Sequence, residues 1–179
     1  YTGEDGVEVS IPGAHAVAVT RAILDSSPSV RLAGLGARDS LRLEAGLCLY
    51  GSDMEEHITP VEAGLAWLIP KSRRGQGGFP GHSLIMDQLR NKSSKIKRVG
   101  LLSHGPPPRG GMDILDSESN KIGHVTSGCP SPTLKKNVAM GYVAKSSVKV
   151  GSKVQVRVRN KLVEAEITKM PFVKCNYFM

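Results

Sequence analysis

Residues 37–67 read ARDSLRLEAGLCLYGSDMEEHITPVEAGLAW, and this stretch is the most informative part of the chain. Its length and its mixture of apolar and charged residues are typical of a buried segment that forms a site. Residues 37–46 are predicted to form a helix that ends at Gly46. A short helix is predicted to begin at Thr59-Pro60-Val61-Glu62. Thr59 can cap it, Pro60 suits the first helical position, and Glu62 can complete a capping box.

The residues on either side of this stretch predict further helices and strands. Before it, Val7, Val9 and Ile11 alternate with polar residues, which predicts a half-buried strand over 7–11. Residues 14–25 predict an amphipathic helix, and residues 30–36 a short apolar strand. After it, residues 67–69 look strand-like and residues 82–90 predict a short helix.

A change in composition at residues 71–95, where Lys, Arg, Gly and Pro accumulate, predicts a domain boundary. Beyond it the pattern is that of β-structure. Strands are predicted at 97–102, 122–127, 138–144, 152–159 and 162–169, with a hairpin connection at Asn160-Lys161 and a rigid loop at 105–111. Short strands between Gly/Pro turns favour a small closed barrel of the Greek-key or jelly-roll type.

The predicted fold class is therefore α+β. Residues 1–80 are expected to contain an antiparallel sheet plus helices, and residues 81–179 to form a C-terminal antiparallel β-barrel domain.

The charge of the chain is distributed unevenly. Residues 1–67 carry a net charge of −6 and residues 68–179 a net charge of +14, within a total of +8. The basic part predicts an acidic partner or ligand, although a solvated basic surface explains the charge equally well. Aromatic residues do not alternate with the basic ones and no nucleic-acid motif occurs, so nucleic acid is a weak candidate. No apolar run approaches the roughly 18 residues of a membrane span.

The cysteines and histidines do not predict a disulfide framework or a metal site. Three cysteines are too few and too widely spaced, and no histidines have the spacing of metal ligands. These residues are expected to be structural or incidental: Cys48, Cys129, Cys175, His15, His57, His82, His104 and His124.

Two charged positions are candidates for ligand binding. Glu8 lies on the face of the predicted strand opposite its apolar residues, and its carboxylate suits the paired N–H donors of an aminopyrimidine. A surface glutamate is the alternative. Arg38 and Arg42 are four residues apart on one helix, so their charges repel. Either an anionic ligand offsets this repulsion, or a salt-bridge network with Asp39 or Glu44 does.

Two aromatic residues are candidates of the same kind. Trp67 is the only tryptophan, and Tyr177 follows an apolar segment near the end of the chain. From the pattern alone, packing is the favoured explanation for both positions.

Four segments together resemble the glycine-cleavage T-protein family of folate-dependent aminomethyltransferases. They are YTGEDGVEVSIP, GLGARDSLRLEAGLCLYGSDMEEHITPVEAGLAW, IGHVTSGCPSPTLKKNVAMGYV and KMPFVKCNY. The folate-binding halves of dimethylglycine and sarcosine dehydrogenases are expected to carry a GYRxWG-like sequence where residues 46–51 read GLCLYG. The folate-dependent iron–sulfur maintenance proteins are expected to carry a KGCYxGQE-like motif, which does not occur.

The resemblance implies that a methylene passes from an aminomethyl-lipoyl group on H-protein to tetrahydrofolate, with release of ammonia. By this resemblance the folate positions are Tyr1, Glu8, Arg38, Trp67 and Tyr177. The implied partners are folate and the lipoylated, typically acidic H-protein, with no metal, nucleic acid or membrane. The implied compartment is the mitochondrial matrix, with a transit peptide outside this chain.

The resemblance covers roughly the last half of the family and implies a three-domain clover leaf. Residues 1–30 would complete the first domain, 31–80 would belong to the second, and 81–179 would form the barrel. The family's essential aspartate would lie upstream of Tyr1. The chain is therefore expected to be an inactive C-terminal fragment without a catalytic residue. The alternative is a non-catalytic folate-binding module or scaffold of the same fold.

Overall fold

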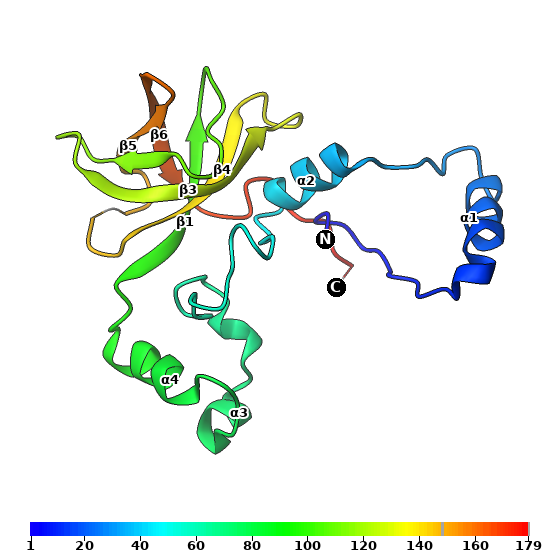
Figure 1. The fold of residues 1–179 in the computed structure, drawn as a ribbon, viewed down its shortest axis with the longest axis horizontal. Coiled ribbons are helices and arrows are strands. Elements are labelled where there is room, and N and C mark those ends of the chain that lie inside the picture. The colour runs from blue at the N-terminus through cyan, green and yellow to red at the C-terminus, as the bar shows by residue number, and fades with distance from the viewer. Residues whose placement is uncertain (148, 179) are drawn as a thin grey trace.

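The C-terminal half of the chain closes into an antiparallel β-barrel (Figure 1). The computed structural model describes residues 1–147 and 149–178. Within these residues the barrel strands are β1 (Ile96–Ser103), β2 (Asp113–Leu115), β3 (Lys121–Pro130), β4 (Asn137–Ala144), β5 (Lys153–Val158) and β6 (Lys161–Thr168). Their order around the barrel is β1-β4-β3-β2-β5-β6, in which β2, β3 and β4 follow one another and β1 returns beside β4, as in a Greek key.

The barrel core follows in part from the alternation of β5 and β6, whereas β4 is buried along almost its whole length. Val154, Val156 and Val158 of β5 are buried, and Val156 lies opposite Val163 of β6. All five predicted strands are confirmed, with bounds that differ by up to three residues. Strand β2 was not predicted, because three residues are too few to show a period. The predicted hairpin connection was one residue out, since Arg159 and Asn160 form the turn and Lys161 begins β6.

The helices lie outside the barrel: η1 (Gly13–His15), α1 (Ala16–Asp25), α2 (Leu35–Glu44), η2 (Ala66–Leu68), α3 (Lys71–Gln76) and α4 (His82–Asn91). Figure 1 shows α2 against the barrel, α1 on an extended arm, and α3 with α4 on a separate side. The helices predicted over 14–25, 37–46 and 82–90 are confirmed. In the part of the chain that is described, no helix has the length and apolar character needed to cross a membrane.

Two predicted strands, over 7–11 and 30–36, are wrong. The N-terminal arm, defined as residues 5–34, contains no strand, and α2 already begins at Leu35. Val7 is 88% exposed and Leu32 is 79% exposed. A strand needs a partner for its backbone groups, and no described strand pairs with either segment. Their alternating pattern therefore has no sheet to join.

The short helix predicted to begin at Thr59 and the strand-like segment predicted at 67–69 are also wrong. The capping box forms, since Thr59 N–H donates to Glu62 Oε2 at 3.0 Å and Glu62 N–H to Thr59 Oγ1 at 3.2 Å. The chain nevertheless makes a turn and no helix, because Gly64 takes φ +70° one turn later. Residues 67–69 lie in and after η2, not in a strand. The segment predicted as a domain boundary contains α3 and α4, and the division into 1–80 and 81–179 stays a prediction.

Helix α2 is fixed to the barrel at its C-terminus. Glu44 accepts hydrogen bonds from the hydroxyls of Ser131 and Thr133 in the β3–β4 loop. Its backbone carbonyl accepts from Phe172 N–H at 2.9 Å and Val173 N–H at 3.0 Å. The C-terminal strap, residues 170–178, therefore passes over the end of α2.

Candidate functional site: a polar pocket between α2 and the barrel

A pocket of about 340 Å³ lies between α2 and strand β3 and is called the α2 pocket below. The N-terminal segment, α2, the chain after it and β3 contribute its lining: Tyr1, Leu35, Arg38, Asp39, Arg42, Leu49, Thr126, Ser127 and Gly128. The pocket thus combines apolar side chains with two guanidinium groups and hydroxyls, which is the composition of a site for a polar ligand.

A buried ion pair lies beside this pocket. Arg42 is 2% exposed and Asp53 is 1% exposed, and Arg42 Nη1 donates to Asp53 Oδ2 at 2.6 Å. Asp53 also accepts from Leu49 N–H at 2.9 Å and from the hydroxyls of Thr126 and Ser127 at 2.5 and 2.9 Å. All these groups are held by charge-assisted hydrogen bonds, which makes the pocket wall rigid.

The charge of Arg42 is neutralised within the protein. Burial lowers the pKa of Arg42, but the hydrogen bonds and charges of Asp39 and Asp53 outweigh it, and the pKa lies above its ordinary value. The salt-bridge alternative from the sequence therefore holds for Arg42.

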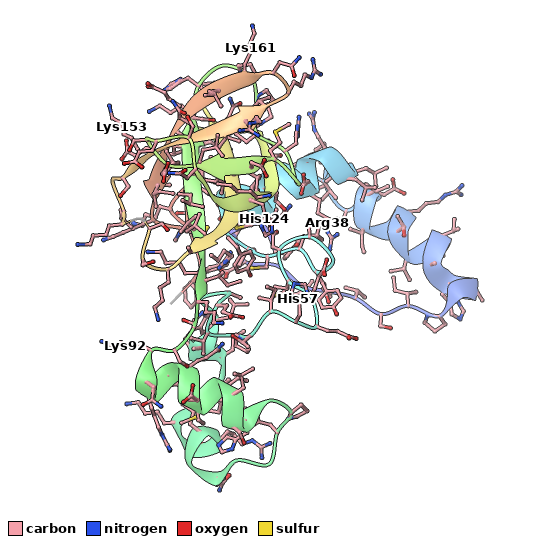
Figure 2. The ribbon with its side chains drawn as sticks, turned by 60° about the vertical axis from the view of Figure 1, so that its left-hand side comes forward. Arg38, His57, Lys92, His124, Lys153 and Lys161 are labelled. Carbon is pink, nitrogen blue, oxygen red and sulfur yellow. The ribbon has the colours of Figure 1, made fainter. Side chains whose placement is uncertain are left out.

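Arg38 remains available for a ligand. Its guanidinium lies over the ring of Tyr1, 4.8 Å from the ring centroid, as in a cation–π contact. It makes no ion pair with a carboxylate of residues 1–147 or 149–178. Figure 2 shows Arg38 beside the barrel. The Tyr1 hydroxyl donates to Cys48 O at 2.9 Å, which fixes the ring.

The structure brings two of the five predicted folate residues together. Tyr1 and Arg38 both line the α2 pocket, whereas Glu8, Trp67 and Tyr177 do not. Tyr177 lies in the C-terminal strap, whose Asn176 N–H donates to Gly3 O at 2.8 Å near Tyr1. Trp67 is 72% exposed on η2, and Glu8 is exposed on the N-terminal arm.

Sequence reasoning missed Asp53, Thr126 and Ser127. Along a regular strand, Thr126 and Ser127 would point to opposite faces. Strand β3 has a register shift between Val125 and Ser127, and this bulge lets both hydroxyls reach Asp53. The spacing of apolar residues in a sequence does not predict where such a bulge occurs. The sequence around Asp53, GSDMEEH at 51–57, contains two further carboxylates and does not single out Asp53 as the buried one.

The cysteines near the pocket do not have the character of nucleophiles. Burial raises the pKa of Cys48 and of Cys129 above the ordinary thiol value. A thiol of raised pKa carries little thiolate at neutral pH and reacts slowly. In the described residues, no three His, Cys, Asp or Glu side chains cluster so as to hold a metal ion.

Comparison with known proteins gives consistent matches over most of the chain. The family model described as the GCVT N-terminal domain matches residues 1–73. The model described as the glycine cleavage T-protein C-terminal barrel domain matches residues 97–174.

Individual relatives match at high identity. The chain is 56% identical over 179 residues to "Aminomethyltransferase, mitochondrial" of Pisum sativum, covering 99% of this chain and 44% of the relative. It is also 56% identical over 178 residues to the protein of that name in Homo sapiens, with the same coverage. The crystal structure of glycine cleavage system aminomethyltransferase T from Bartonella henselae matches with a TM-score of 0.88 and 39% identity, over 94% of this chain and 46% of that one. The chain thus spans less than half the length of these relatives.

Proposed function

Because the chain belongs to the glycine cleavage T-protein family, we propose that its residues form the folate-binding part of an aminomethyltransferase. In the proposed reaction, the methylene of an aminomethyl group on the lipoyl arm of H-protein passes to tetrahydrofolate, and ammonia leaves. Tetrahydrofolate is the acceptor substrate. The role of these residues is to bind and orient it, and none of them is proposed as catalytic.

The placement of Arg38 beside Tyr1 in the α2 pocket carries this proposal. A guanidinium can bind a carboxylate through two parallel hydrogen bonds, and folate ends in a glutamate carboxylate. The ring of Tyr1 offers a flat surface for the apolar part of the ligand. Because Asp39 and Asp53 neutralise Arg42, Arg38 is the group that attracts the anion.

The remaining predicted residues extend this site. Glu8 is proposed to accept hydrogen bonds from the aminopyrimidine edge of the pterin, and Trp67 and Tyr177 to line the folate site with Tyr1. These roles rest on the family resemblance.

The proposed protein partner is lipoylated H-protein, and the proposed compartment is the mitochondrial matrix. The relatives carry "mitochondrial" in their names. The +14 charge of residues 68–179 would attract an acidic carrier and the glutamates of folate. Association with H-protein is then expected to weaken as salt is added. Unchanged affinity across the salt series contradicts the electrostatic part of the proposal.

A chimera tests the function directly. These 179 residues replace the matching segment of the Pisum sativum aminomethyltransferase, and formation of methylenetetrahydrofolate from aminomethyl-loaded H-protein is measured. The chimera is expected to be active. Arg38→Gln should raise KM for tetrahydrofolate by about tenfold or more, because a hydrogen bond to a charged group contributes about 1.5–3 kcal/mol.

The matched control for this variant is Arg21→Gln, an exposed arginine on α1, which should leave KM unchanged. A folded chimera that neither turns over nor binds tetrahydrofolate contradicts the proposal. A folded chimera that binds tetrahydrofolate without turnover favours the non-catalytic binding module.

A further inference from the structure

A second, larger groove lies on the barrel, at a place that the proposed function does not use. Its volume is about 580 Å³, and it runs between the loop at 105–111 and the β5–β6 turn. Pro107, Met112 and Val158 contribute apolar surface. Arg109, Arg159 and Lys161 contribute three cationic groups. This surface is called the proline-loop groove below.

The loop that forms one wall of the groove is fixed on β3. Gly111 N–H donates to Val125 O at 2.8 Å, and Val125 N–H donates to Met112 O at 2.8 Å. A Cβ atom on Gly110 would lie 2.8 Å from Thr126 O, so the loop approaches the strand as closely as glycine allows. The wall is therefore formed before any ligand arrives, which lowers the entropic cost of binding.

The charge of Arg109 is oriented within this wall. Arg109 Nη1 donates to Gly128 O at 2.8 Å, which holds the guanidinium and leaves its other N–H groups for a ligand. Gly128 also lines the α2 pocket. The hydrogen bond therefore connects a residue of the groove to a residue of the α2 pocket, while the two linings share no residue.

The cations of the groove have no anionic partner in the described part of the chain. No acidic residue lines the groove. None of Arg109, Arg159 and Lys161 forms an ion pair with a carboxylate of residues 1–147 or 149–178. By contrast, the nearby barrel cations Lys121 and Arg157 both pair with Asp113.

We propose that the proline-loop groove binds a small organic anion that joins an apolar body to a carboxylate or phosphate group. The apolar side chains would contact the body, and the three cations would converge on the anionic group. The volume lies in the usual range of small-molecule sites, about 300–1,000 Å³. The proposal is independent of the folate site, since Tyr1 and Arg38 take no part in it.

Nuclear magnetic resonance of methyl-labelled methionine in the full chain tests this proposal. Phenylacetate and phenyl phosphate are the two anionic probes. Phenylethanol supplies the apolar body alone, and inorganic phosphate the charge alone. At least one anionic aromatic probe is expected to shift the Met112 methyl signal saturably, while the signal of Met140, fully buried in another cluster, stays in place. The stronger of the two aromatic probes identifies carboxylate or phosphate as the preferred group.

Three variants locate the binding. Arg109→Gln and Lys161→Gln are each expected to weaken the probe about fivefold, as removal of one partly exposed charge should. Lys153→Gln is the matched control, because Lys153 begins β5 and does not line the groove. Figure 2 labels Lys153 and Lys161 at separate places on the barrel. The side chain of Lys161 makes no hydrogen bond with the described residues, so its variant leaves the barrel intact even if the Arg109 variant does not fold.

The proposal is overturned by any of four results. They are an unshifted Met112 signal with both anionic probes, equal affinity for phenylethanol, equal affinity for inorganic phosphate, and equal weakening by Lys153→Gln. The measurement does not involve turnover, so its failure leaves the folate proposal untouched.

Discussion

Asp53 connects parts of the molecule that lie far apart in the sequence. Its carboxylate binds Arg42 of α2, the backbone of Leu49, and two hydroxyls of β3. Its backbone carbonyl accepts from the Tyr142 hydroxyl at 2.8 Å, and burial raises the pKa of Tyr142 far above its ordinary value. One side chain therefore fixes the helix, the following loop and the barrel together.

Replacing Asp53 by Asn is expected to destabilise the protein by about 3–5 kcal/mol, because it leaves the buried charge of Arg42 with no buried anionic partner. Urea unfolding followed by circular dichroism measures the change. Asp113→Asn is the control, since Asp113 is partly exposed and pairs with the exposed side chains of Lys121 and Arg157, so its loss should change stability little. An equal loss of unfolding free energy in the two variants would show that the buried Arg42–Asp53 pair stabilises the protein no more than the Asp113 pairs do.

Cys48 and Cys129 are expected to react slowly in the folded protein. Burial raises both thiol pKa values, so the thiolate fraction at about pH 8 is smaller than in the unfolded chain. Iodoacetamide labelling, resolved by peptide mass, should be slower at both positions in buffer than in urea. Equal rates in the two conditions would contradict the raised pKa values.

Some residues of the candidate site could be predicted from the sequence and others could not. Arg38 is predicted both from the residue pattern and from the family resemblance, Tyr1 from the resemblance alone, and the structure places the two in contact. Asp53, Thr126 and Ser127 were not named, because their meeting depends on a bulge and on contacts between residues more than 70 positions apart. Such contacts have no local signature.

At the scale of elements, helix α2 ends in a Schellman motif. Leu47 N–H donates to Arg42 O and Gly46 N–H to Leu43 O, both at 2.9 Å, with Gly46 at φ +71°. The prediction that Gly46 ends this helix holds in its physical detail. The C-terminal strap packs against the same glycine, so the turn also sets where the strap passes.

Gly46→Ala is expected to destabilise the protein by more than Gly51→Ala, as measured by thermal unfolding. Both glycines have positive φ, so both substitutions carry a backbone cost of about 1 kcal/mol. Only at Gly46 would the new Cβ lie 2.9 Å from Met170 Cβ and 3.3 Å from Pro171 Cα, whereas Gly51 faces open space. A larger loss at Gly51 would refute the packing argument.

The elements differ in how well their patterns predicted them. Five of the six described barrel strands are predicted, because their alternating or apolar patterns span at least six residues, whereas β2 has only three residues although it too pairs on both sides. The same alternation at Val7 and Val9 produced no strand, because nothing in the described chain pairs with it. An alternating hydrophobic pattern shows that a segment favours the strand conformation, but a strand forms only where a second strand pairs with it.

At the scale of the whole molecule, the barrel has a dense core and the N-terminal arm has none. No residue from 4 to 34 is buried, although the arm carries Val7, Val17 and Leu32. The barrel, by contrast, buries a continuous cluster of Val, Ile, Leu and Ala side chains. Stability is therefore concentrated in residues 96–168.

Thermolysin, which cuts beside apolar residues, is expected to remove the N-terminal arm first and to leave a product that contains the barrel strands. Exposed segments without packing are the preferred sites of cleavage. Mass analysis over time identifies the order of the cuts. Early cleavage within β1 or β4 would contradict this distribution of stability.

The contact between Gly3 and Asn176 has a practical consequence for protein engineering. Asn176 N–H donates a hydrogen bond to Gly3 O at 2.8 Å and Asn176 Nδ2 donates to Glu4 Oε1 at 3.0 Å, so residues 3–4 and residue 176 lie side by side (Figure 1). A fluorophore pair attached next to Glu4 and Asn176 would therefore report, by energy transfer, whether the C-terminal strap stays attached to the N-terminal segment.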